Sequence, residues 1–160
     1  MLYTPGPWGG PAGYQTFSAA IPDDKIIYNF HFYQPHKYTH QGTKNNKKKY
    51  NYPGLINGKF INKKYLEREL SYATQWAKKN KKLLFVGEFS VSSKAPNKEK
   101  YLIDLMDLFE KNNLSYAYFS FNGWIGWSYP FEDYTSNNQN KNSSLIVLSK
   151  YWSQNNTNVK

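Results

Sequence analysis

The sequence predicts an α/β fold in which parallel strands alternate with helices. Apolar runs of strand type occupy residues 26–33, 83–90 and 115–121, and a pattern of helical period separates each run from the next. This alternation builds right-handed parallel units, which form either an open doubly wound sheet or a closed barrel. No glycine-rich phosphate-binding motif follows a strand, so the barrel is favoured. A closed (β/α)8 barrel takes about 250 residues, so a chain of 160 residues with about four strands predicts one incomplete domain, half of a barrel.

The strands are predicted from short apolar runs bounded by turn residues. Residues 26–33 read IIYNFHFY, residues 83–90 read LLFVGEFS and residues 115–121 read SYAYFSF. A short apolar start at residues 1–3 precedes the segment PGPWGGPAGY, whose proline and glycine content predicts a loop without regular structure. The third strand runs into an aromatic loop with glycines at residues 122–134.

The helices are predicted from apolar side chains that recur every three or four residues. One face of the first helix carries Ile61, Tyr65, Leu66, Leu70, Ala73, Trp76 and Ala77. The second begins at Asn97, ends near Asn112 and Asn113, and has an apolar stripe of Leu102, Leu105, Met106 and Phe109. A last helix, with Leu145, Leu148 and Trp152 inward, precedes a polar tail at residues 153–160.

Composition limits the classes of function. The chain is 39% hydrophobic and 19% aromatic, enough for a core, and its net charge is +10. The lysines are dispersed and mixed with asparagines, which is typical of a solvated surface and does not favour nucleic acid as a partner. There is no cysteine, so disulfides and thiolate metal sites are excluded. No signal peptide or membrane-spanning run is recognised in the sequence, and the compartment stays open.

Reactive side chains lie at the ends of two predicted strands. Glu88 follows a largely apolar run, where burying a charge is costly, and a carboxylate at such a place indicates chemistry. His31 and Tyr33 end the earlier strand, and their spacing of two places both on one face. The ends of parallel strands meet at one edge of a barrel, so these three residues predict one shared site. Residues 34–58 form a long loop of the kind that shapes a cleft.

Three segments together resemble the C-terminal half of glycoside hydrolase family 5, the cellulase-like retaining glycosidases. They are HFYQPHKYTHQG from residue 31, VGEFS from residue 86 and YAYFSFNGWIGWSY from residue 116, and the opening TPGPWGGPAGY is also similar to a loop of that family. The resemblance implies strands five to eight of the barrel with their helices. It also implies cleavage of β-glycosidic bonds in a glucan or related polysaccharide, without a cofactor.

The resemblance implies a role for individual residues. Glu88 matches the catalytic nucleophile, Tyr33 the hydroxyl that hydrogen-bonds it, and His31 the histidine of the cleaving subsite. Tyr116 aligns with the sugar platform of strand eight, where the family usually has tryptophan. The candidates for further substrate contacts are Trp124, Trp8 and His40, with His36 and Gln41 as weaker ones.

The family's acid/base glutamate follows an asparagine on strand four, and no Asn-Glu pair occurs in this chain. We therefore expect the isolated chain to be inactive or very weak. Glu132 and Asp133, in the loop after the last strand, are expected to be solvated loop residues. A half barrel exposes a sheet edge and an apolar face, so we expect it to pair with an N-terminal half-barrel chain or to self-associate.

Other classes of function stay open from the residues alone. The aromatic loops could serve a non-catalytic carbohydrate-binding module, and the positive charge could serve electrostatic binding of nucleic acid, which salt would abolish. A metal site built from His31, His36 and His40 is not favoured, because no carboxylate or cysteine joins them at ligand spacing.

Overall fold

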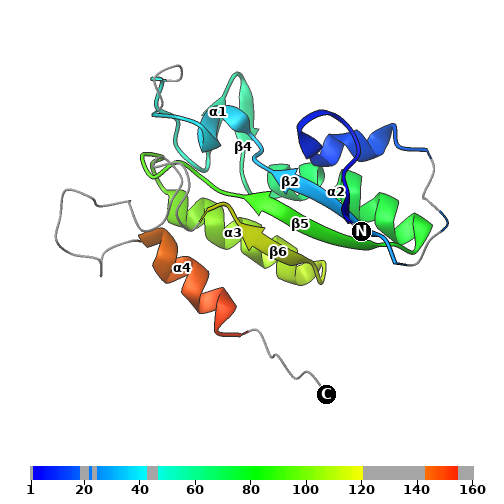
Figure 1. The fold of residues 1–160 in the computed structure, drawn as a ribbon. Coiled ribbons are helices and arrows are strands. Elements are labelled where there is room, and N and C mark those ends of the chain that lie inside the picture. The colour runs from blue at the N-terminus through cyan, green and yellow to red at the C-terminus, as the bar shows by residue number, and fades with distance from the viewer. Residues whose placement is uncertain (1, 19–21, 23–24, 43–46, 121–142, 155–160) are drawn as a thin grey trace.

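The computed structural model describes residues 2–18, 22, 25–42, 47–120 and 143–154. Its centre is a four-stranded sheet in the order β1-β2-β5-β6 (Figure 1). These strands span Leu2–Tyr3, Ile27–Phe32, Leu83–Phe89 and Ser115–Tyr118. Each neighbouring pair is parallel. The predicted alternation of parallel strands and helices is therefore confirmed.

Helices cover one face of this sheet. They are α2 (Lys63–Asn80) and α3 (Lys98–Lys111), whereas α4 (Ser143–Trp152) packs against α3, where the Tyr151 hydroxyl donates to the Ile103 carbonyl over 3.2 Å. The Trp76 ring of α2 lies 4.7 Å from the Tyr28 ring, and the Phe109 ring of α3 lies 5.2 Å from the Phe89 ring, between centroids. All four residues are buried. This layer holds the hydrophobic core, as the apolar helical stripes predict.

No α-helix covers the opposite face of the sheet among the described residues. Successive side chains of a strand point to opposite faces, so Ile27, Asn29 and His31 face away from the helices. Ile27 keeps 39% of its surface exposed and Leu83, its partner in register, keeps 68%. The reactive side chains lie on this open face, at the carboxyl ends of the strands.

Two loop predictions are wrong in part. The segment PGPWGGPAGY forms two 3₁₀ helices, η1 (Pro7–Gly9) and η2 (Pro11–Gln15), because a proline fits the first position of such a turn. The loop at residues 34–58 contains α1 (His36–Thr39) and most of a hairpin, β3 (Gly54–Ile56) with β4 (Lys59–Ile61). Ile61 thus ends a strand, although it is buried as expected.

The remaining element boundaries follow local signals closely. The Asn62 side chain accepts a hydrogen bond from the Tyr65 N–H and begins α2, and α3 begins after Asn97 as predicted. In α4, Leu148 is buried, but Val147 and Tyr151 are the other buried apolar residues, whereas Leu145 and Trp152 are only half-buried. No helix in the described part of the chain is long and apolar enough to cross a membrane.

Candidate active site

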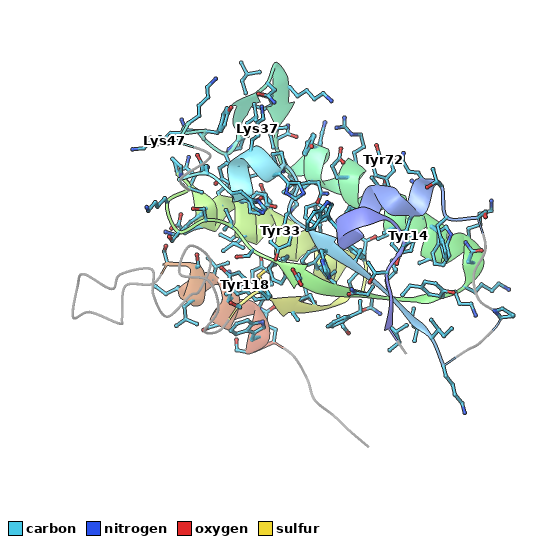
Figure 2. All side chains as sticks on the ribbon, turned by 45° about the horizontal axis from the view of Figure 1, so that its top comes forward. Tyr14, Tyr33, Lys37, Lys47, Tyr72 and Tyr118 are labelled. Carbon is cyan, nitrogen blue, oxygen red and sulfur yellow. The ribbon has the colours of Figure 1, made fainter. Side chains whose placement is uncertain are left out.

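Glu88, His31 and Tyr33 meet at the carboxyl ends of β2 and β5. The Tyr33 hydroxyl donates a hydrogen bond of 2.9 Å to Glu88 Oε2. Nδ1 of His31 lies 3.7 Å from the same oxygen, and the two side chains are 28% and 32% exposed. Figure 2 labels Tyr33, the residue that follows β2, beside the blue ribbon of that strand. The structure thus brings together the three residues that the sequence predicts to share a site.

A bulge in β5 turns Glu88 toward His31. Phe30 pairs with Val86 and His31 pairs with Glu88, so Gly87 is an extra residue on β5. In a regular pairing His31 would face Gly87, and Glu88 would fall on the face that packs against the helices. The bulge moves the carboxylate to the open face and leaves Phe89 buried on the helix side.

Tyr33 is fixed as a hydrogen-bond donor. Burial raises its pKa far above the ordinary value, and the charge of Glu88 and the hydrogen bond to it raise the pKa further. The phenol therefore keeps its proton at any physiological pH. Thr39 Oγ1 donates to the Tyr33 carbonyl over 2.7 Å, which ties α1 to the end of β2.

An open groove of about 410 Å³ lies beside these residues. His31 and Tyr33 line it together with Trp8, Gln34 and His36. Trp8 is 92% exposed and has a φ of 60°, a backbone conformation rare for a bulky residue. The groove joins the catalytic candidates His31 and Tyr33 to an exposed aromatic ring that can stack on a ligand.

His40 packs behind Tyr33 and is absent from the residues that line the groove. Its ring lies 5.4 Å from the Tyr33 ring and 4.8 Å from the His36 ring, between centroids. Burial lowers the pKa of His40 to about 4, and the neighbouring His36 contributes to this shift. Burial also lowers the pKa of His36.

Acid should destabilise the folded chain through His40. A histidine with a lowered pKa binds fewer protons in the folded chain, so its contribution to stability is present above the ordinary value of 6.5 and is lost as the pH falls toward about 4. Thermal midpoints across this window should fall less steeply for His40→Gln than for the native chain. Lys37→Gln, on the helix α1 that precedes His40, is the control and should keep the native slope. Equal slopes for the native chain and His40→Gln contradict the prediction.

The structure places Tyr116 away from the other site candidates. Its ring packs against Phe89 and Phe109, and its hydroxyl donates to Glu110 over 2.7 Å, so it faces α3. This placement does not suit a sugar platform. Trp124, Glu132 and Asp133 lie outside the described residues.

Three residues near the site were missed by the sequence reasoning. Phe119 follows β6, is 38% exposed, and donates its N–H to the carbonyl of Phe89, the residue after Glu88. Asn29 and Thr4 lie next to His31 and bond to each other over 2.9 Å. The spacing of two between Asn29 and His31 was a usable signal, because it places both on one face of β2. No group of three or more potential metal ligands gathers among the residues that the structure describes.

A parallel sheet with helices on one face and a carboxylate at its strand ends is typical of the (β/α)-barrel class. The sequence model of the family Cellulase (glycosyl hydrolase family 5) matches residues 2–124. The chain belongs to this family.

Two curated relatives of the chain are named as glucan-degrading enzymes. The chain is similar to endoglucanase C of Acetivibrio thermocellus, with 28% identity over 151 residues that cover 77% of this chain and 41% of the relative. It is also similar to cellodextrinase A of Ruminococcus flavefaciens, with 31% identity over 108 residues that cover 62% of this chain and 30% of the relative. The chain thus spans less than half the length of these relatives.

Solved structures share the fold. Cel5A of Thermotoga maritima, an endoglucanase, superposes with a TM-score of 0.70 at 24% identity over 92% of this chain and 47% of its own. The cellulose synthase subunit Z of Clostridioides difficile superposes with a TM-score of 0.69 at 24% identity over 91% of this chain and 48% of its own. These neighbours imply a (β/α)8 barrel, of which this chain corresponds to about half the length.

Proposed function

We propose that the chain is the C-terminal half of a retaining β-glycosidase barrel and that Glu88 is the nucleophile. The observation that carries the proposal is the convergence of the Tyr33 hydroxyl at 2.9 Å and of His31 Nδ1 at 3.7 Å on one oxygen of Glu88. A carboxylate held by donors, on the open face of the sheet and beside a groove, is placed to attack a sugar. Family membership supports the same chemistry.

In a retaining mechanism the Glu88 carboxylate attacks the anomeric carbon, and the leaving oxygen takes a proton from a second carboxyl group about 5 Å away. Water then hydrolyses the glycosyl ester with the second group acting as base. The other described carboxylates all belong to helices α2 and α3: Glu67, Glu69, Glu99, Asp104, Asp107 and Glu110. We propose that the missing acid/base comes from the other half of the barrel.

The substrate that we propose is a β-linked glucan or a related polysaccharide. The matched relatives are called endoglucanase and cellodextrinase, and Thermotoga maritima Cel5A has been solved with cellobiose and with mannotriose. In this chain the exposed Trp8 ring at the rim of the groove suits the apolar face of a sugar.

A complementation assay tests the proposal. The chain is assayed alone and after mixing with a separately produced N-terminal half-barrel of a family member, on a chromogenic β-glucoside and on cello-oligosaccharides. Turnover should appear only in the mixture. A mixture that forms a stable complex and yet hydrolyses none of these substrates contradicts the proposal.

The exposed Trp8 ring also favours a second candidate function, carbohydrate binding without catalysis. This alternative predicts that the chain alone binds cello-oligosaccharides, that Trp8→Ala abolishes binding, and that no mixture with a half-barrel turns over substrate. Isothermal titration with cellotetraose measures the binding. Turnover by the complemented enzyme excludes the alternative.

Tyr33→Phe should slow the complemented enzyme. A hydrogen bond to a charged group is worth about 1.5–3 kcal/mol, so losing the phenol hydroxyl predicts a loss of roughly 10- to 10²-fold in kcat. The measurement is kcat and KM on the chromogenic substrate. Tyr72→Phe, a tyrosine on α2, is the control and should leave kcat unchanged. An unchanged kcat in Tyr33→Phe contradicts a role of the hydroxyl at Glu88.

A further inference from the structure

Asn29 is a buried polar residue that lies next to the candidate catalytic histidine. It is 7% exposed and precedes His31 by two positions on β2, so both side chains point to the open face of the sheet. Burying an amide is costly unless its groups are hydrogen-bonded, so the partners of the Asn29 amide indicate what the residue does.

The amide nitrogen of Asn29 has two neighbours that can accept hydrogen bonds. Nδ2 donates to Thr4 Oγ1 over 2.9 Å and lies 3.3 Å from Nε2 of His31. An amide nitrogen carries two hydrogens and offers no acceptor. Its contact with His31 is therefore a hydrogen bond only if Nε2 is unprotonated, and the hydrogen of the neutral ring then lies on Nδ1.

The surroundings of His31 favour this orientation of the amide. Nδ1 faces Glu88 Oε2 at 3.7 Å, where a ring hydrogen is attractive and a lone pair would face a negative charge. Turning the amide would place Oδ1 opposite Nε2, would require the hydrogen there, and would leave the Nδ1 lone pair toward the carboxylate. For a neutral imidazole, the two contacts are both favourable when Asn29 donates to Nε2.

We infer that Asn29 is a positioning residue that fixes His31 in the Nδ1–H tautomer. In this tautomer the Nδ1–H of His31 points toward Glu88 Oε2, the oxygen that already accepts a hydrogen bond from the Tyr33 hydroxyl. Nε2 is occupied by Asn29 and is not available as a donor to a ligand. The importance of the tautomer for turnover rests on the proposed function, whereas the tautomer itself is a property of the chain alone.

Nitrogen NMR of the chain measures the tautomer directly. The chain has 3 histidines, and long-range proton–nitrogen correlations at about pH 8, above the usual range of histidine titration, show which nitrogen of each ring carries the hydrogen. His36→Gln and His40→Gln assign the signals. We expect Nδ1–H for His31. A native chain with Nε2–H overturns the inference without any variant.

Two substitutions separate positioning from a structural role. Asn29→Asp replaces the donor by an acceptor and should move the hydrogen of His31 to Nε2. Asn29→Leu removes the hydrogen bond and should leave His31 as a mixture of the two tautomers. Thr4→Val is the matched control, because it removes the other partner of Nδ2 and should keep Nδ1–H. Proton–nitrogen fingerprint spectra verify that each variant is folded. An unchanged tautomer in folded Asn29→Asp and Asn29→Leu overturns the inference.

The complemented enzyme gives a second readout. Asn29→Leu should lower kcat about tenfold, the low end for loss of an outer-shell partner, with little change in KM. If the Asn29 substitutions change the tautomer of His31 but leave kcat unchanged, the tautomer is not important for turnover. A complemented enzyme without any activity instead refutes the proposed function and leaves the tautomer result standing.

Discussion

Replacing Glu88 by glutamine is expected to lower kcat of the complemented enzyme by on the order of 10⁴- to 10⁶-fold, as for loss of a nucleophile in other covalent mechanisms. Glutamine has the shape of glutamate and still offers an oxygen to the Tyr33 hydroxyl, so the fold and the groove should persist. The neutral amide, however, cannot attack the anomeric carbon to form the glycosyl ester. The measurement is the initial rate on the chromogenic β-glucoside.

A matched control separates this effect from a general change of charge. Glu67 is a carboxylate of α2 that pairs with Lys111 over 2.7 Å at the surface, and Glu67→Gln should leave kcat unchanged. A Glu88→Gln rate within about tenfold of the native rate contradicts the assignment, because truncation of a nucleophile costs far more. A 2-deoxy-2-fluoro glycoside should label Glu88 in the native complemented enzyme, and mass spectrometry of its peptides identifies the ester.

The parts of the fold that periodicity decides were predictable from the sequence. The strands β2 and β5 and the helices α2 and α3 bury continuous apolar faces, and burial of such faces is the main driving force of folding. The meeting of Glu88 with Tyr33 and His31 was predictable for a topological reason. Parallel neighbouring strands bring their carboxyl ends to the same edge, although the bulge that turns Glu88 to the open face does not follow from topology.

Features that depend on tertiary contacts were not predictable in the same way. The hairpin of β3 and β4 turns at Asn57 and Gly58, both with positive φ, and the pair Asn-Gly was a signal that the polar composition of the loop obscured. The 3₁₀ helices form where prolines and glycines predicted only a loop. The contact of Asn29 with Thr4 joins segments 25 positions apart and left no pattern in the sequence.

Register explains where the structure places Tyr116. Tyr116 pairs with Val86, whose side chain is buried on the helix face, so its ring also packs there. An alignment by motif cannot show this, because the bulge near Gly87 changes which side chains of β5 share a face. His40 lies at the end of the short helix α1, and that helix turns its ring behind Tyr33.

Gly87→Ala is expected to have the second largest effect on activity. A Cβ at this position would collide with Oδ1 of Asn29, so either the amide or the bulge must move. Because the bulge sets the direction of Glu88, a shift of about 1 Å in the carboxylate predicts a loss of about 10²-fold in kcat. Overpacking should also lower the free energy of unfolding by about 1–3 kcal/mol. Kinetics of the complemented enzyme and urea denaturation of the chain measure the two effects.

A double-mutant cycle isolates the contact that causes this loss. Asn29→Ala removes the atom that a Cβ at residue 87 would strike, so adding it to Gly87→Ala should recover most of the lost stability, with a coupling of about 0.5–3 kcal/mol. Gly10→Ala is the control for adding a methyl group to a glycine, since its Cβ would meet only the Gln34 amide at 3.4 Å. Additive losses in the cycle would show that the glycine is needed for another reason than room beside Asn29. A Gly87→Ala enzyme with native kcat would show that the bulge does not aim Glu88.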